Sequence, residues 1–200
     1  MRTFAVPPLA AAILTLALLP AYAEDGRGLG FVPWKILKAG EPRPATPLVL
    51  YWIPLSSDDF RRSELLTYRP LTTYPPDCLS MIVVRADDGA LIARLGVSGK
   101  LPTAVLVGGD GSVIGAVPNE RGALSAAAVD KLLRDTLRAR EEALDRDLDD
   151  APKKLGVGDR DAAVALYRHV WESRCLFPRH AKEAERALRK LGVPLVAASR

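Results

Sequence analysis

Residues 48–53 read LVLYWI, an apolar and aromatic run that would leave no charged side chain on either face of an extended strand. A strand with one face in water usually alternates polar and apolar residues, whereas this one needs cover on both faces. The run is short and rich in β-branched and aromatic residues, which favours a strand over a helix. It therefore predicts the centre of a sheet covered by helices, and so an α/β fold.

The segment after this strand has the signals of a helix start. Ser56 or Ser57 can cap a helix running to about Leu66, because Asp58 and Asp59 would then lie in its first turn, where negative charge is favoured. The further predicted elements are a short strand or surface segment at 31–38, a strand at 80–86, a helix at 88–96, a strand at 103–109, its hairpin partner at 112–117 and a long helix from Ser125.

Toward its C-terminus the chain is predicted to contain helices and no strands. Apolar residues recur there at helical spacing in two stripes, which predicts an antiparallel helix pair. The first stripe contains Ala163, Leu166, Tyr167, Val170 and Trp171, and the second contains Ala184, Ala187, Leu188 and Leu191. The predicted division is a sheet-containing domain at 47–148 and a helical extension at 149–200.

The first 23 residues have the pattern of an export signal. Leu9 to Leu19 is a nearly continuous apolar run, and Ala21-Tyr22-Ala23 has the A-x-A form that signal peptidases accept. The run is shorter than the roughly 18 to 20 apolar residues needed to span a bilayer, so no stable membrane insertion is expected. We predict an exported protein, periplasmic or secreted, in which a lead and a Pro-rich connector occupy residues 24–46.

The charge distribution and the motifs of the chain limit the classes of ligand that it is expected to bind. The 28 basic and 24 acidic residues are interspersed, which is typical of a solvated surface rather than a nucleic-acid interface. No phosphate-binding or dinucleotide-binding glycine motif occurs, and the two histidines form no cluster with metal-ligand spacing, so we predict no cofactor and no metal.

The two cysteines, Cys78 and Cys175, stand outside any C-x-x-C motif. An oxidising compartment favours a disulfide between them, and the alternative is two free buried thiols.

The stretch LVLYWIPLSSDD at 48–59 resembles the active-site segment of thioredoxins, whose usual form is LVDFWAPWCGPC. Tyr51, Trp52 and Pro54 keep the family's aromatic-Trp-x-Pro frame. Leu101-Pro102-Thr103 resembles its hydrophobic-Pro-Thr element, in which the proline is cis and faces the active site, and Asp110-Gly111 matches the turn of its last hairpin. The resemblance covers about residues 45–145 and implies a thioredoxin-like fold.

The reactive groups of that family are missing. Disulfide exchange needs a thiolate to attack and a second thiol to resolve the mixed intermediate, but Ser56 and Asp59 stand at those two positions. Leu50 replaces the buried aspartate that the resemblance implies as proton acceptor. Thioredoxin-type dithiol chemistry is therefore impossible at residues 56–59, and we predict no catalytic residue.

The helical extension resembles half of a tetratricopeptide repeat. Gly158, Ala163, Tyr167 and Val170 occupy the repeat's offsets, whereas Pro178 comes three residues later than the repeat expects. One repeat cannot bury its own apolar face, so these helices are expected to pack on the rest of the chain or on another protein.

These features predict a non-catalytic exported module that binds a protein or peptide. The candidate groove contains Trp52, Pro54, Ser56 and Pro102, where the resemblance implies pairing with an extended chain. Two alternatives stay open. One is a thiol-disulfide protein that uses Cys78 and Cys175, and the other is a glutathione-binding protein in which a serine holds the thiol cofactor.

Overall fold

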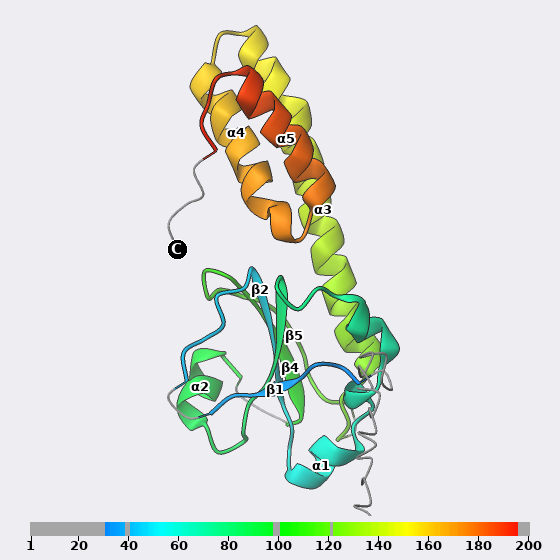
Figure 1. Ribbon diagram of the computed structural model, residues 1–200. Helices are drawn as coiled ribbons and strands as arrows, with labels where there is room; N and C mark the ends of the chain where they lie inside the picture. The colour runs from blue at the N-terminus through cyan, green and yellow to red at the C-terminus, as the bar shows by residue number, and fades with distance from the viewer. Residues whose placement is uncertain (1–30, 39–40, 98–100, 121, 196–200) are drawn as a thin grey trace, which may run out of the picture.

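The computed structural model describes residues 31–38, 41–97, 101–120 and 122–195 of the 200-residue chain. This part of the chain forms a mixed α/β structure, in which a five-stranded sheet is accompanied by helices, including long helices toward the C-terminus (Figure 1). The predicted α/β class is confirmed. The predicted export signal and the first residues of the lead, 24–30, lie outside the described residues.

The sheet is built around β2, Leu48–Ile53, whose six residues are all buried. It pairs with β3 in parallel and with β4 in antiparallel orientation, so Trp52 lies between Val83 and Ala104. This central position confirms the strand predicted from LVLYWI. The strand order is β1-β3-β2-β4-β5, with β1 parallel to β3 and β5 antiparallel to β4. The other strands are β1 at Lys35–Ile36, β3 at Leu79–Val83, β4 at Thr103–Gly108 and β5 at Val113–Val117.

The first helix, α1, is shorter than the sequence predicts. It ends at Arg62 rather than near Leu66, because Ser63 adopts an extended backbone and its hydroxyl accepts a hydrogen bond from the Leu65 N–H at 3.3 Å. Such a local bond competes with the helical ladder, and the chain continues as a 3-10 turn. The helices are α1 at Ser57–Arg62, α2 at Gly89–Arg94, α3 at Ala126–Gly156, α4 at Arg160–Glu172 and α5 at Pro178–Lys190, and the 3-10 turns are η1 at Glu64–Leu66, η2 at Arg69–Thr73 and η3 at Ser173–Cys175.

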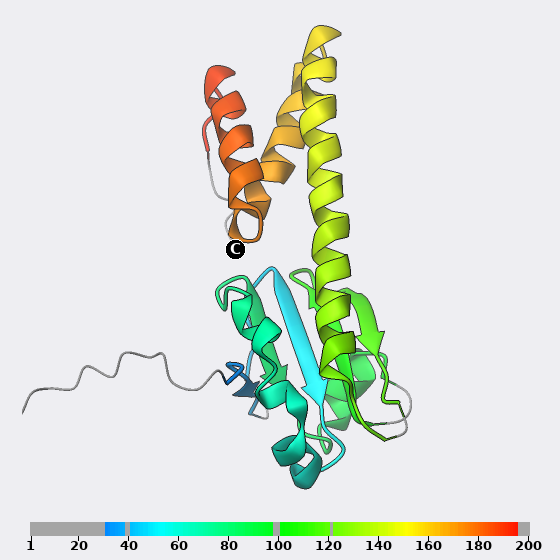
Figure 2. The same cartoon turned by 90° about the vertical axis from the view of Figure 1, so that its right-hand side faces the viewer.

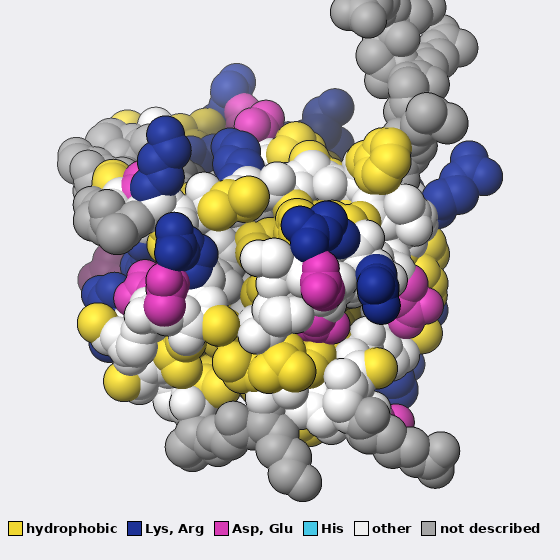
Figure 3. Space-filling model, turned by 90° about the horizontal axis from the view of Figure 1, so that it is seen from below, with side chains coloured by type: hydrophobic (Ala, Val, Ile, Leu, Met, Phe, Trp, Pro, Cys, Tyr) yellow, Lys and Arg dark blue, Asp and Glu magenta, His cyan; other side chains and the backbone are white. Residues whose placement is uncertain are grey.

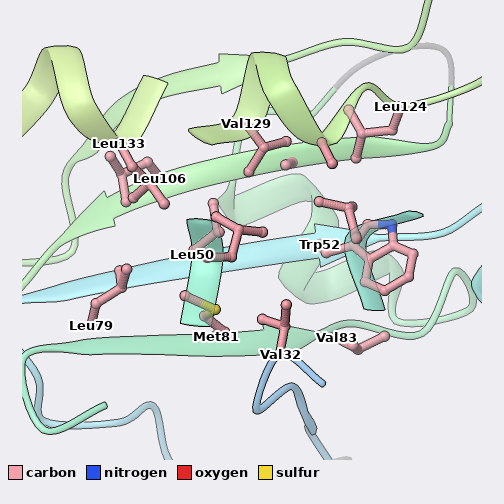
Figure 4. Packing of buried hydrophobic residues seen from close by; sticks show 14 of the residues in the cluster. Val32, Leu50, Trp52, Leu79, Met81, Val83, Leu106, Leu124, Val129 and Leu133 are labelled. Carbon is pink, nitrogen blue, oxygen red and sulfur yellow. The ribbon is translucent and has the colours of Figure 1, made fainter. Parts of the chain in front are cut away.

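Alternate residues of β2 contribute to two separate hydrophobic cores. Leu50 and Trp52 belong to the core beneath α3, which also contains Leu106 and Leu133 (Figure 4). Tyr51 belongs to the opposite core, beneath α2. Figure 1 shows α2 and α3 on opposite sides of the sheet, so both faces of β2 are covered.

Helix α3 belongs to both parts of the molecule (Figures 1 and 2). Its start is held by the Ser125 hydroxyl, which accepts a hydrogen bond from the Ala128 N–H, and by the Glu64 carboxylate, which accepts one from the Ala126 N–H at 2.8 Å. The first half of α3 packs on the sheet, and the second half leaves the sheet and packs on α4 and α5. The predicted boundary at residue 148 therefore falls inside one continuous helix.

The helical extension packs on α3 rather than across the sheet. Helices α4 and α5 run antiparallel beside the second half of α3, as Figures 1 and 2 show. The four positions that resemble the tetratricopeptide repeat have structural roles: Gly158 has φ +82° in the turn before α4, where glycine avoids the strain of a side chain. Ala163, Tyr167 and Val170 are buried against α3 and α5. The apolar stripes predicted from the sequence thus form the core of this part.

Candidate functional site

The carboxyl ends of the parallel strands β1, β2 and β3 meet at one edge of the sheet, where α1 also begins. A groove of about 770 Å³ lies there, and we call it the strand-end groove. Figure 3, which looks at the molecule from the end that carries α1, shows hydrophobic side chains beside alternating basic and acidic ones. The groove is lined by Ile36, Pro54, Ser56, Ser57, Phe60, Arg61 and residues 83–87.

Ser56 and Asp59, which stand where the resemblance places two cysteines, are both engaged in helix capping. The Ser56 hydroxyl accepts a hydrogen bond from the Asp59 N–H at 3.1 Å, and the Asp59 carboxylate accepts one from the Leu55 N–H at 2.9 Å. This reciprocal pair satisfies backbone donors at the helix start that would otherwise have no partner. Their helix-start role, predicted from the sequence, is confirmed.

Nothing near Ser56 activates it as a nucleophile in the part of the chain that the structure describes. Asp58 forms an ion pair with Arg61, and Asp59 is the capping partner. The two histidines lie in the helical extension, where His169 pairs with Asp147 and His180 pairs with Asp145 of α3. A serine without a neighbouring base remains a weak nucleophile at neutral pH, so residues 56–59 contain no activated nucleophile.

The rim of the groove carries a second ion pair. Arg85 donates to both oxygens of Asp87, at 3.0 and 2.6 Å, and this bidentate hydrogen bond lowers the pKa of Asp87. Both side chains are exposed, so the pair holds the loop after β3 only weakly. Arg61 and Arg85 each have a carboxylate partner, Asp58 and Asp87, so the rim carries two exposed ion pairs.

Trp52 lies in the core beneath the groove rather than on its surface. It is fully buried within the core that Figure 4 shows. Its ring stacks on Phe60 with centroids 5.1 Å apart and meets the edge of Trp34 at 5.2 Å. Trp34 Nε1 donates to the Leu65 carbonyl, whereas Trp52 Nε1 has no hydrogen-bond partner among the described residues. Phe60, which lines the groove, is therefore supported from behind by Trp52.

Pro102 lies beside Pro54 at the same edge of the sheet. The register pairs Ile53 with Thr103, so the two prolines flank the last pair of β2 and β4. Pro102 is buried, its peptide bond with Leu101 is cis as the resemblance implies, and it is not part of the lining of the strand-end groove.

The backbone beside Pro102 is already partly engaged. The Leu101 carbonyl accepts a hydrogen bond from Asn119 Nδ2 at 3.1 Å, and the other side-chain atom of Asn119, Oδ1, accepts one from the Gly122 N–H. Asn119 uses one of the two lone pairs of this carbonyl, so an extended chain that paired here would share the oxygen with Asn119. Of the four predicted groove residues, the structure thus brings Pro54 and Ser56 into the groove, with Trp52 behind it and Pro102 next to Pro54.

Most of the groove lining was not predicted from the sequence. Phe60, Arg61 and residues 83–87 were not among the predicted site residues. The signal for the second group was present, because residues that follow adjacent parallel strands meet at one edge of a sheet.

Cys78 and Cys175 lie away from the groove. Cys78 precedes β3, at the opposite end of that strand from the groove, and Cys175 ends η3. Their sulfur atoms are 2.08 Å apart and their Cα atoms 5.5 Å apart, which is consistent with the predicted disulfide. The pair joins the start of β3 to the corner between α4 and α5.

The described residues contain no group of three or more His, Cys, Asp or Glu side chains arranged to hold a metal ion. Within the same residues, no helix combines the length and the apolar character needed to cross a membrane. Comparisons of the chain with protein-family models, curated proteins and solved structures found no match.

Proposed function

We propose that this chain is a non-catalytic thioredoxin-like module that binds an extended segment of a partner protein in the strand-end groove. The strand order β1-β3-β2-β4-β5, with a parallel first half and an antiparallel final hairpin, supports the thioredoxin-like interpretation of the sequence. The fold alone does not assign a function, so the proposal depends on the groove.

The observation that carries the proposal is that residues 56 and 59 are engaged in hydrogen bonds beside an open groove. Their side chains hold the start of α1 through reciprocal hydrogen bonds, while the surface that they frame stays open as a groove. Binding pockets are typically apolar, with a few polar groups that fix orientation, and they often lie outside the carboxyl ends of parallel strands. The groove has this composition without a reactive group.

The lining of the groove suggests the chemistry of its partner. Pro54, Phe60 and Val83 provide apolar surface suited to one large side chain, and Arg61 and Arg85 lie at the rim. We therefore expect an extended peptide with a large apolar residue next to an acidic one. Such a peptide would gain apolar burial, and its carboxylate would compete for the arginines with Asp58 and Asp87, whose exposed ion pairs hold them only weakly.

A peptide library displayed against the full-length chain tests this expectation. Selected peptides should share an apolar residue beside Asp or Glu, and their affinity can be measured by fluorescence polarisation. Ser57→Trp would fill the groove while leaving the Ser56 cap in place, and it should weaken binding by about tenfold or more. A matched control is Ala165→Trp, which adds the same side chain to an exposed position on α4.

The two variants discriminate between the possible binding surfaces. Loss of binding in Ser57→Trp with normal binding in Ala165→Trp supports the groove. The opposite result would contradict the proposal and assign binding to the helical extension. Circular dichroism of both variants should match the parent chain, because both positions are exposed.

A further inference from the structure

A cavity lies on the face of the sheet that α2 covers. It is bounded by α2, the connector before β2 and the strands β2 and β4. It has a volume of about 520 Å³, and we call it the Tyr51 cavity. Figure 1 shows α2 on the side of the sheet away from α3, so this cavity is separate from the core beneath α3. None of its lining residues was among the predicted site residues.

The Tyr51 hydroxyl is a hydrogen-bonding group that is available at the cavity. Tyr51 is only 1% exposed and lines the cavity, yet its hydroxyl makes no hydrogen bond within the described residues. A hydroxyl without a protein partner at the wall of a cavity can donate a hydrogen bond to a ligand bound there. Burial raises the pKa of Tyr51, which keeps the phenol neutral and able to donate.

Two arginines line the same cavity. The positive charges of Arg43 and Arg94 act on the Tyr51 hydroxyl and partly offset the effect of burial on its pKa. Arg43 is positioned by a hydrogen bond from its Nη2 to the Gly109 carbonyl at 2.9 Å. Arg94, at the end of α2, has no ion-pair partner in the described part of the chain.

Gly111 lets Arg43 occupy this position. A Cβ atom at residue 111 would lie 2.5 Å from Arg43 Nη1, and Gly111 also has φ +92°, a conformation that other residues rarely adopt. The hairpin turn and the arginine are thus fitted to each other.

The acidic residues of the cavity are engaged with backbone groups. Glu41 accepts a hydrogen bond from the Lys38 N–H, and Asp88 caps α2 by accepting one from the Leu91 N–H, both at 3.1 Å. The Lys38 side chain also lines the cavity, so three cations face two carboxylates. The cavity therefore has one excess positive charge, beside apolar surface from Leu91, Leu95 and Val107.

We propose that the Tyr51 cavity binds a small organic carboxylate with an apolar body. The carboxylate would lie between Arg43, Arg94 and the Tyr51 hydroxyl, because guanidinium groups bind carboxylates through paired charge-assisted hydrogen bonds. The apolar body would pack on the leucines of α2 and on Val107. A single excess charge and this apolar surface favour a carboxylate over phosphate. The site lies apart from the strand-end groove and does not depend on the proposed function.

Titration of benzoate into the full-length chain at low ionic strength, followed by isothermal calorimetry, tests this assignment. Saturable binding is expected. Tyr51→Phe keeps the ring and removes only the hydroxyl, and it should weaken binding by about fivefold to tenfold. Arg94→Gln should weaken it by about tenfold or more, because it removes a charged donor. Arg85→Gln is the matched control, since this arginine lines the strand-end groove instead, and it should leave benzoate binding unchanged.

Two further probes define the ligand class. Benzyl alcohol keeps the apolar ring without the charge, and inorganic phosphate keeps a charge without the ring. Each should bind at least about tenfold more weakly than benzoate. Absence of saturable benzoate binding, normal binding in both Tyr51→Phe and Arg94→Gln, or phosphate binding as tight as benzoate would each overturn the proposal.

Discussion

The sheet and the helical extension are stabilised in different ways. Strand β2 is buried along its whole length between two hydrophobic cores, so the centre of the sheet is enclosed on both faces. The helical extension buries one stripe of each helix against the second half of α3, and several of its apolar residues, such as Leu166 and Trp171, stay partly exposed. An α-helix pair with one buried face depends on its neighbour for stability. The extension should therefore be the less stable part.

Two connections hold the extension in place. One is α3, which continues from the sheet into the helical cluster, and the other is the Cys78–Cys175 pair. Leu137 of α3 and Leu176 near the disulfide contact both cores. These connections cross the same junction at two points, which predicts that removing either one should affect the extension more than the sheet.

The largest effect should come from the shared core of the sheet. Trp52→Ala removes a fully buried ring that supports both Phe60 and Trp34, and it should lower the free energy of unfolding by about 3–5 kcal/mol. Denaturant unfolding followed by circular dichroism measures the change. Leu188→Ala, equally buried in α5, is the matched variant for the extension.

The comparison between the two regions depends on what Leu188→Ala does. If the regions differ as described, it should melt α4 and α5 early and leave the main transition of the sheet in place. A single transition that shifts equally in both variants would show one cooperative unit and would contradict the distinction.

The next effect concerns the disulfide. Replacing both cysteines with serine opens a loop with a sequence separation of 97 residues, and it should lower the free energy of unfolding by about 2–4 kcal/mol. Hydrogen exchange should accelerate in α4 and α5 while the amides of β2 stay protected. Unchanged exchange in the helices would mean that α3 alone holds the extension.

Much of the fold could be predicted from the sequence because its strongest signals are local. The LVLYWI run, the turn at Asp110-Gly111 and the cap at Ser125 each determine an element that the structure contains. The extent of α1 could not be predicted, because the Ser63 hydroxyl ends the helix by capping the 3-10 turn that follows. The continuity of α3 past residue 148 was missed as well, because the same helix packs on two different cores.

The candidate site was harder to predict because it depends on contacts between distant residues. Trp52 was expected to be covered as part of the LVLYWI strand, but the strand pattern does not show that Trp34 and Phe60 are the rings that cover it. The engagement of the Leu101 carbonyl depends on Asn119, eighteen residues away. The Tyr51 cavity combines residues from the connector, β2 and α2, and no local pattern joins them.

A third effect should arise where η2 meets α3. Tyr74 Oη donates a hydrogen bond to the buried carboxylate of Asp130 at 2.8 Å. Arg134 Nε forms an ion pair with the same carboxylate at 3.1 Å. Tyr74→Phe should lower the free energy of unfolding by about 1–3 kcal/mol at neutral pH, because Asp130 would lose a donor. Tyr167→Phe is the matched variant in the extension, where the hydroxyl makes no hydrogen bond within the described residues, and it should change stability little.

The same tyrosine gives the chain a dependence on alkaline pH. Burial, and then the hydrogen bond with Asp130, raise the pKa of Tyr74 above that of an unfolded tyrosine. The folded state thus holds this proton more tightly, so its contribution is complete below about pH 10 and is lost as the pH rises further. Denaturant unfolding at several alkaline pH values gives the free energy of unfolding as a function of pH. This free energy should fall less steeply with rising pH for Tyr74→Phe than for the parent chain. Equal slopes would contradict this origin.

The smallest effects should come from removing two serine caps, one on α1 and one on α3. Their sizes compare a helix that belongs to the groove alone with the helix that both regions share. Ser125→Ala removes the cap of α3, which both regions need, and it should lower the free energy of unfolding by about 1 kcal/mol. Ser56→Ala removes the cap of α1, a six-residue helix without a buried residue, and its effect should be smaller and confined to faster exchange near residues 57–62. If Ser56→Ala destabilised the whole chain as much as Ser125→Ala, α1 would be part of the structural core, and the interpretation of residues 56 and 59 as the local frame of a binding groove would be wrong.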